Sequence, residues 1–177
     1  MDLRRKNLAG TLVFPVREDL VLLGLKTKKI GEGQWNGWGG GQKEGESIRQ
    51  TACRELKEES GFSARLEDLE HVGKVLFHNF KDGRYFDVEV HMFLMRVWEG
   101  GLRPNKEMAN PTWWRFSELP FGEMLPSDPD WMPQVLRGEW IEGETWQEWV
   151  KEPDGHYKVG LTRPSVVKKV DKLGDVD

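Results

Sequence analysis

Apolar residues gather in short blocks along the chain, and their spacing predicts strands on both sides of one helix. Four blocks have the length of strands, and a polar turn joins the members of each pair: 8–16 with 20–26, and 69–80 with 85–98. Within the last block, Phe86, Val88 and Val90 alternate with polar residues, which is typical of a strand with one buried face. We therefore predict two β-hairpins, with a glycine-rich segment and a helix between them.

The helix is predicted over residues 47–60, where apolar residues recur at every fourth position from Ile48 to Leu56. Ser47 followed by Gln50 forms the capping-box pattern that starts a helix. Gly61 comes directly after the last helical residue and suits a left-handed C-cap. This segment therefore carries its own start and stop signals.

The second half of the chain has weaker patterns. We predict a short strand, a turn of helix, an ordered loop, a short helix and a final hairpin over residues 112–116, 117–120, 121–132, 133–137, and 146–150 with 156–161. The residues from 164 onward are charged and poor in aromatic side chains, and we predict a frayed tail there. These elements predict an α/β or α+β fold, with one domain over 1–163 and a charged tail over 164–177.

Three glutamates on the predicted helix form a candidate metal site. At about 100° per residue, Glu55, Glu58 and Glu59 cover an arc of roughly 100° beside the apolar stripe. Burial, mutual repulsion and the helix macrodipole all disfavour carboxylates there, and a divalent cation relieves each of these costs. Oxygen ligands without histidine or thiol favour Mg²⁺ or Mn²⁺ over zinc, and Arg54 is positioned to hold one carboxylate. The alternative interpretation is a solvated acidic helix face.

The segment before the helix is rich in glycine. Residues 31–41 contain six glycines, interleaved with Trp35, Asn36 and Trp38. Because glycine lets a backbone approach a ligand closely or adopt positive φ, we interpret this segment as one wall of a ligand pocket. It is not a Walker loop, since no Gly-Lys-Ser/Thr follows, and it lacks the strand context of a Rossmann loop. A flexible hairpin is the alternative interpretation.

The glycine-rich segment and the helix together resemble the Nudix box. Gly40 is followed after five residues by Glu46 and after seven more by Arg54-Glu55-Leu56-Lys57-Glu58-Glu59-Ser60-Gly61-Phe62, so every fixed position of that motif is filled. The resemblance implies a mixed β-sheet sandwiched between α-helices, and Mg²⁺-dependent hydrolysis of a nucleoside diphosphate linked to another group. It also implies that Glu55, Glu58, Glu59 and the Gly39 carbonyl bind the metal, and that Arg54 orients the site.

Beyond the box, residues 9–135 resemble the Nudix branch that hydrolyses oxidised purine nucleoside triphosphates such as 8-oxo-dGTP. Matching segments are LVLLGLK, GQWNGWGGG, FDVEVHMF, KEMANPTWW, LPFGEM and PDWMP. The roles implied are a base contact for Asn36, pocket walls at Thr11, Lys26, Trp38 and Phe77, and a metal-binding loop carboxylate at Glu107.

The resemblance departs in one stretch. That branch has tryptophan, proline and two aspartates where this chain has Leu125-Pro126-Ser127-Asp128. Leu125 therefore stands in place of a stacking aromatic ring, which is worth about 1–3 kcal/mol per base. Asp128 is the aspartate that remains to contact the base. Purine recognition is expected, and a preference for an 8-oxo base stays open.

The residue patterns and the Nudix resemblance together predict hydrolysis of a purine or oxidised purine nucleoside triphosphate to monophosphate and pyrophosphate. The phosphates need charge neutralisation and the attacking water needs a base, for which Glu58, Glu59 and Glu107 are all candidates. Alternative substrates are NDP-sugars, dinucleotide polyphosphates and RNA 5′ ends. A prenyl diphosphate isomerase is disfavoured by the lack of a second cysteine or histidine constellation. A binding module with an inactive box is disfavoured by the intact glutamates.

Composition indicates which domain number, binding partners and cellular location to expect for this activity. The chain has 177 residues, of which 37% are hydrophobic, enough for one domain with a buried core. A net charge of −4 argues against stable, non-specific binding to nucleic acid. Cys53 is the single cysteine, so no disulfide forms within the chain, and no apolar run reaches membrane-spanning length. We expect a cytoplasmic monomer whose partner is a small nucleotide.

Overall fold

The structure, a computed structural model, describes residues 6–28, 31–103, 105–174 and 176–177. The strands are β1 (Lys6–Arg17), β2 (Leu20–Lys26), β3 (Trp35–Asn36), β4 (Leu69–Lys81), β5 (Arg84–Met95), β6 (Met108–Arg115), β7 (Ile141–Lys151) and β8 (Tyr157–Lys169). The α-helices are α1 (Ile48–Ser60) and α2 (Asp128–Leu136), and the short 3₁₀ helices are η1 (Leu66–Asp68), η2 (Phe116–Glu118) and η3 (Phe121–Glu123). None of the helices in the described ranges has the length and apolar character needed to cross a membrane.

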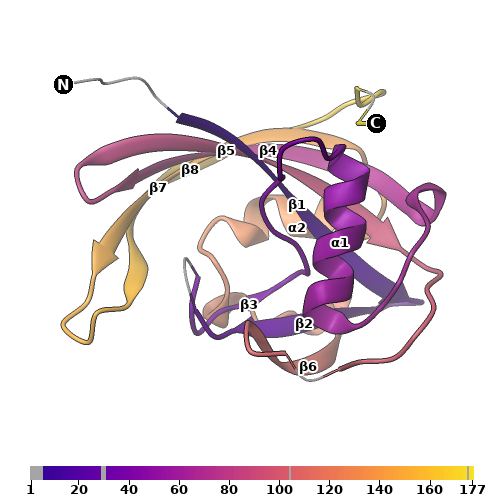
Figure 1. Ribbon diagram of the computed structural model, residues 1–177. Helices are drawn as coiled ribbons and strands as arrows, with labels where there is room; N and C mark the ends of the chain where they lie inside the picture. Colours follow the sequence, from indigo (N-terminus) through magenta and orange to yellow (C-terminus); the bar gives the residue numbers. More distant parts are fainter. Residues whose placement is uncertain (1–5, 29–30, 104, 175) are drawn as a thin grey trace.

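The strands form one mixed sheet in the order β3-β2-β1-β5-β4-β7-β8, with β6 paired to β2 (Figure 1). β1 pairs with β5 and β4 with β7 in parallel, and all other pairs are antiparallel. The two predicted hairpins are β1–β2 and β4–β5. The parallel pairings bring β1 beside β5, and β7 beside β4.

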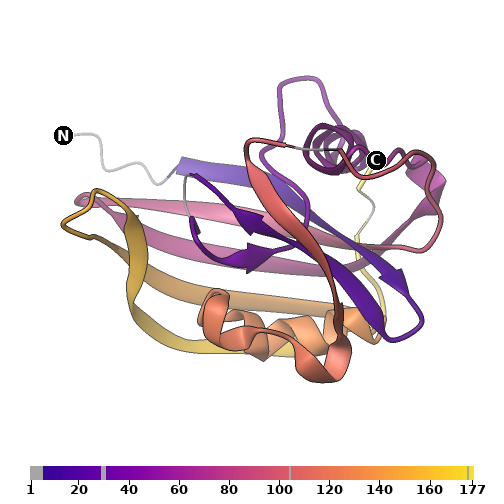
Figure 2. The ribbon, with the colours of Figure 1, turned by 90° about the horizontal axis from the view of Figure 1, so that it is seen from below.

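One helix covers each face of the sheet. Figure 2 shows α1 on one side and α2 on the other. In β5, Met92 and Leu94 pack in the core with α2, whereas Phe93 and Met95 pack in the core with α1. Because successive strand side chains point to opposite faces, an unbroken apolar run fits a strand that is covered on both sides. The prediction of a mixed sheet between helices is confirmed.

The second helix begins earlier than the sequence predicts. The boundary expected at Pro133 is wrong, because α2 already begins at Asp128 and Pro133 lies inside it. Pro129, in the first turn, is the proline that suits a helix start. The buried face of the helix consists of Asp128, Trp131, Met132, Val135 and Leu136. The apolar members of this face hold α2 against the sheet.

The predicted frayed tail is wrong at its beginning. β8 continues to Lys169, which pairs with Ile141 of β7. Most side chains of β8 are exposed, so the strand lacks the apolar alternation by which strands are predicted. Backbone hydrogen bonds to β7 keep it in the sheet.

Candidate active site

α1 begins and ends where the sequence predicts. The Ser47 hydroxyl accepts the Gln50 N–H at 3.1 Å, and the Gln50 side chain accepts the Ser47 N–H at 2.8 Å, which completes the capping box. Gly61 has a φ of 85° and donates its N–H to the Lys57 carbonyl at 3.0 Å. These caps fix the positions at which the charged side chains leave the helix.

Arg54 lies at the centre of a network that ties α1 to the glycine-rich segment. Its guanidinium donates to the two Glu46 carboxylate oxygens at 2.5 and 2.9 Å, and to the Gly41 carbonyl at 3.1 Å. It also donates to Glu55 at 2.6 Å and to Glu58 at 3.4 Å. The hydrogen bonds from Arg54 lower the pKa of Glu46 to about 2. Arg54 is therefore in contact with the carboxylates that an orienting residue must hold.

Glu59 is the buried carboxylate of the cluster, with 8% of its surface exposed. Its Oε2 accepts the Gly39 N–H at 2.9 Å. Burial raises the pKa of Glu59 to about 7, although the Gly39 hydrogen bond opposes the shift. The negative charges of Glu55 and Glu107 raise this pKa further, and the positive charge of Lys26 lowers it. Residues from four separate segments therefore act on one carboxyl group.

Two glycines allow the loop before α1 to pack closely. A Cβ on Gly39 would meet the Thr11 carbonyl oxygen at 1.9 Å, and a Cβ on Gly40 would meet the Glu55 carboxylate carbon at 2.6 Å. The Thr11 N–H donates to the Gly40 carbonyl at 2.9 Å. The loop thus lies between β1 and α1. The Gly39 carbonyl, which the resemblance assigns to the metal, belongs to this loop, and it is the Gly39 N–H that contacts Glu59.

The donor chemistry of this cluster fits a hard divalent cation. Within the described ranges, no three acidic, histidine or cysteine side chains are already grouped as metal ligands. Three expected ligands contact cationic side chains instead: Glu55 and Glu58 contact Arg54, and Glu107 pairs with Lys28 at 2.7 Å. Burial of Glu59 near other carboxylates nevertheless creates a cost that a cation relieves. Because the donors are carboxylate and backbone oxygens, Mg²⁺ or Mn²⁺ fits best.

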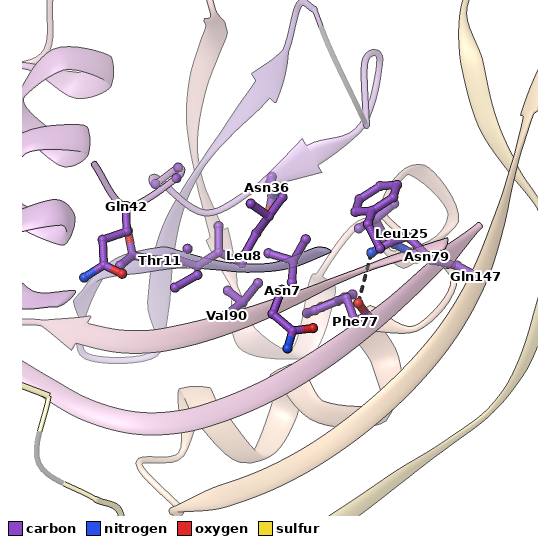
Figure 3. Close-up of a pocket in the computed structure, with 18 of the residues that line it drawn as sticks. Asn7, Leu8, Thr11, Asn36, Gln42, Phe77, Asn79, Val90, Leu125 and Gln147 are labelled. Atoms are coloured by element: carbon purple, nitrogen blue, oxygen red, sulfur yellow. Dashed lines mark hydrogen bonds between the residues drawn. The ribbon is translucent and has the colours of Figure 1, made fainter. Parts of the chain in front are cut away.

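A cavity of about 580 Å³ lies beside this cluster, between β1, β4, β5, β7 and the start of α2. Six of the seven predicted substrate-binding residues line it: Thr11, Lys26, Asn36, Phe77, Leu125 and Asp128. Figure 3 labels Thr11, Asn36, Phe77 and Leu125 among them. Gly39 and Gly40 line the same cavity. Because Gly39 also contacts Glu59, the carboxylate cluster and the cavity share one loop.

Trp38 is the predicted residue that does not line this cavity. It is 1% exposed, and its Nε1–H donates to the Leu22 carbonyl at 2.9 Å. It pairs with Val13 of β1 and packs in the α1 core, where it borders a second cavity of about 430 Å³ together with Glu59. The prediction that Trp38 forms a wall of the base pocket is therefore wrong, because its pairing with Val13 directs the ring toward α1.

Asp128 brings a buried acid to the main cavity. It is 2% exposed, and its Oδ2 accepts the Leu125 N–H at 3.1 Å. Burial raises the pKa of Asp128 to about 8; the Leu125 hydrogen bond opposes this shift and the negative charge of Asp130 adds to it. Asn36 is held by its own side-chain carbonyl, which accepts the Gly37 N–H at 2.9 Å. The cavity thus presents a mostly neutral carboxyl group and a fixed amide at pH 7.

Three buried residues with polar groups in the cavity lining are absent from the sequence-based prediction: Asn79, Trp131 and Gln147. Thr11 Oγ1, Trp131 Nε1 and Gln147 Oε1 are buried polar atoms that have no hydrogen-bond partner among the described residues. Unpaired buried polar atoms are uncommon, and a ligand that supplies the missing partner is one explanation. For Gln147 the sequence does contain a signal: its spacing from Trp149 places both side chains on one face of a predicted strand.

Comparison with known proteins identifies the class. The sequence profile of the NUDIX domain matches residues 6–136, so the chain belongs to this family. It is a hydrolase of the pyrophosphatase type. Oxidized purine nucleoside triphosphate hydrolase of Mus musculus is 38% identical over 127 residues, which cover 72% of this chain and 78% of that protein, and the protein of the same name from Danio rerio has the same values. The crystal structure of a MutT protein from Bacillus halodurans matches with a TM-score of 0.68 at 24% identity, covering 88% of this chain and 96% of that one, which confirms the fold.

Proposed function

We propose that this chain is a Mg²⁺-dependent pyrophosphohydrolase that converts a purine or oxidised purine nucleoside triphosphate to the monophosphate and pyrophosphate. One observation carries the proposal: the loop that packs against the Nudix-box carboxylates also lines the cavity. Gly39 contacts Glu59 and lines the cavity, and Lys26 lines it while its charge acts on Glu59. A nucleotide with its base in the cavity would therefore have its phosphates beside the carboxylate cluster.

The cavity has the size and composition expected of a nucleotide site. A volume of about 580 Å³ lies within the range of roughly 300–1,000 Å³ of small-molecule pockets. Phe77, Val88 and Leu125 supply apolar walls, and Asn36 and Asp128 supply polar groups. This mixture suits an aromatic base that is recognised at its edges.

The charged residues of the cluster would have different roles at the phosphates of a bound nucleotide. A divalent ion held by Glu55, Glu58, Glu59, Glu107 and the Gly39 carbonyl would neutralise phosphate charge and lower the pKa of a bound water. Arg54 keeps Glu55 and Glu58 in place through its hydrogen bonds. Lys26 adds positive charge at the phosphate end of the cavity. Glu58, Glu59 and Glu107 are the carboxylates available to take the proton of the attacking water.

The names of the mouse and zebrafish relatives agree with this substrate class. Leu125 and Ser127 differ from the tryptophan and aspartate expected from the resemblance. We therefore include both oxidised and ordinary purine nucleoside triphosphates in the proposed substrate class. The substrate screen below compares their kcat/KM values. We further propose that the enzyme acts as a cytoplasmic monomer on the free nucleotide pool.

A substrate screen tests the proposal. Purified protein with Mg²⁺ is incubated with dGTP, 8-oxo-dGTP, dATP, dCTP, an NDP-sugar, a dinucleotide polyphosphate and a 5′-triphosphorylated RNA. Chromatography quantifies the nucleotide products of every substrate, and pyrophosphate release is compared with phosphate release for the triphosphates. We expect the purine nucleoside triphosphates to yield monophosphate and pyrophosphate at higher kcat/KM than dCTP. Equal efficiency on dCTP and the purines would refute the purine assignment. A higher efficiency on the sugar, dinucleotide or RNA substrates would replace the proposed substrate class.

A further inference from the structure

A side-chain network at one end of the cavity has orientations that follow from donor and acceptor chemistry alone. Trp149 Nε1–H can only donate, and it contacts Asn79 at 2.9 Å, so the contacted atom is the Asn79 carbonyl oxygen. The Asn79 NH₂ in turn donates to the Phe77 carbonyl at 3.0 Å, and a carbonyl can only accept. These two contacts fix the Asn79 amide in one orientation.

The orientation of Asn79 fixes that of Gln147. The two residues are direct partners in the parallel pairing of β4 with β7. The Gln147 atom that faces the Asn79 oxygen at 2.9 Å must be the donating NH₂ group. The Gln147 carbonyl oxygen, Oε1, is then the free end of the network. It is buried and has no hydrogen-bond partner among the described residues.

The place of Gln147 in the cavity indicates what could satisfy this oxygen. Figure 3 shows Asn79, Leu125 and Gln147 together at the end of the cavity opposite Gln42. Gln42 directly follows the glycines that contact the Nudix-box helix, so its end is the phosphate end. Gln147 therefore lies at the base end. An unpaired buried acceptor is destabilising, and a ligand that donates to it gains a hydrogen bond while removing that cost.

We propose that Gln147 is a specificity-determining residue whose Oε1 accepts a hydrogen bond from the exocyclic amino group of a purine base, and that Asn79 positions it. This inference rests on the proposed function, because it assumes that a purine enters the cavity. Burial of Gln147 Oε1 in the network anchored by Trp149 means that a base lacking the amino group leaves the acceptor unpaired. A site built to hydrogen-bond a group strongly rejects an analogue that lacks it.

Nucleoside monophosphates that differ by one amino group test the proposal without hydrolysis. Affinities are measured by calorimetry, without added metal, for GMP against IMP, which lacks the 2-amino group, and for AMP against purine riboside monophosphate, which lacks the 6-amino group. The wild type should bind the amino-bearing member of one pair at least about tenfold more tightly. The pair that shows the difference identifies which amino group Gln147 contacts.

Two glutamine substitutions supply the variant and its matched control. Gln147→Met keeps the side-chain length and removes both the acceptor and the NH₂ group that donates to Asn79, while Trp149 still holds Asn79. Gln134→Met makes the same change at another glutamine whose Oε1 is buried and unpaired, on α2 outside the cavity lining. We expect the affinity ratio to fall to within about twofold in Gln147→Met and to stay at the wild-type value in Gln134→Met. Gln147→Met also loses the buried hydrogen bond to Asn79, so its melting temperature should fall modestly, and affinities are compared at a temperature where both variants are fully folded.

The outcomes separate this inference from the proposed function. A wild-type ratio within twofold for both pairs, or a wild-type ratio retained in Gln147→Met, overturns the inference even if the enzyme hydrolyses purine nucleoside triphosphates. A ratio that is large in the wild type and lost only in Gln147→Met supports it, even if the substrate screen finds no pyrophosphate release and so overturns the proposed function. The wild-type comparison needs no variant, so a poorly folding Gln147→Met cannot leave the proposal without a test.

Discussion

The substitution Asp128→Asn should remove a pH-dependent cost from the folded state. Asp128 is 2% exposed, and its pKa is raised from 3.8 to about 8 by burial. Between these two pH values the unfolded chain releases the proton and the folded protein keeps it. The unfolded state therefore binds fewer protons, and the stability of the wild type falls as pH rises through this window. Below about pH 4 both states are protonated and the cost disappears.

The size of this effect follows from the width of the window. Each pH unit inside it costs about 1.4 kcal/mol, so a rise from pH 5 to pH 7 lowers the free energy of unfolding by about 2.7 kcal/mol through Asp128. Asparagine is neutral at every pH, and its carbonyl can still accept the Leu125 N–H. The stability gained by Asp128→Asn should therefore grow by about 2.7 kcal/mol between pH 5 and pH 7. Shifted groups elsewhere, such as His71 and Glu59, are shared by both proteins and cancel in the difference.

Urea unfolding at pH 5, 6 and 7 without metal measures this difference, with the fluorescence of the nine tryptophans as the signal. Glu123→Gln is the matched control, because it removes an exposed carboxylate from the segment just before the same helix and is not among the charges that act on Asp128. Its stability relative to the wild type should change little with pH. If the gap between Asp128→Asn and the wild type is the same at pH 5 and pH 7, Asp128 is not held neutral by burial and the reasoning fails.

Three further predictions concern the active site. Glu59→Gln should lower Mg²⁺-dependent kcat by at least about a hundredfold, and it should leave the metal-free melting temperature unchanged or higher because a buried carboxylate becomes neutral. The exposed Glu67→Gln is the control, and wild-type turnover in Glu59→Gln would contradict the metal-site assignment. Leu125→Trp should lower KM for purine nucleotides by roughly tenfold with kcat little changed, since stacking on the base is uniform binding. The exposed Leu161→Trp is its control, and an unfolded Leu125→Trp would contradict the pocket placement. Mg²⁺ plus a purine nucleotide should raise the melting temperature by mass action, and no shift at millimolar concentration would argue for a non-nucleotide substrate.

The sequence by itself determined the helix at the active site and the chemistry it carries. Ser47, Gln50 and Gly61 define the two ends of α1 through hydrogen bonds to residues three or four positions away. The spacing of Arg54 and Glu59 within the same segment fixes where they lie on the helix surface. These relations are local, so the order of residues is enough to predict them, and the family follows from the fixed spacing of the box.

Only the tertiary structure decided which polar groups meet inside the cavity. Asn79 and Gln147 are 68 residues apart and contact each other because β4 and β7 pair in parallel in one particular register. The pKa of Asp128 depends on how completely distant segments cover it, and the side toward which Trp38 turns depends on its pairing with Val13. The residues of β8 belong to the sheet through backbone bonds that leave no apolar pattern. Register, burial and desolvation are properties of segments brought together by folding, and the spacing of residues within one segment does not contain them.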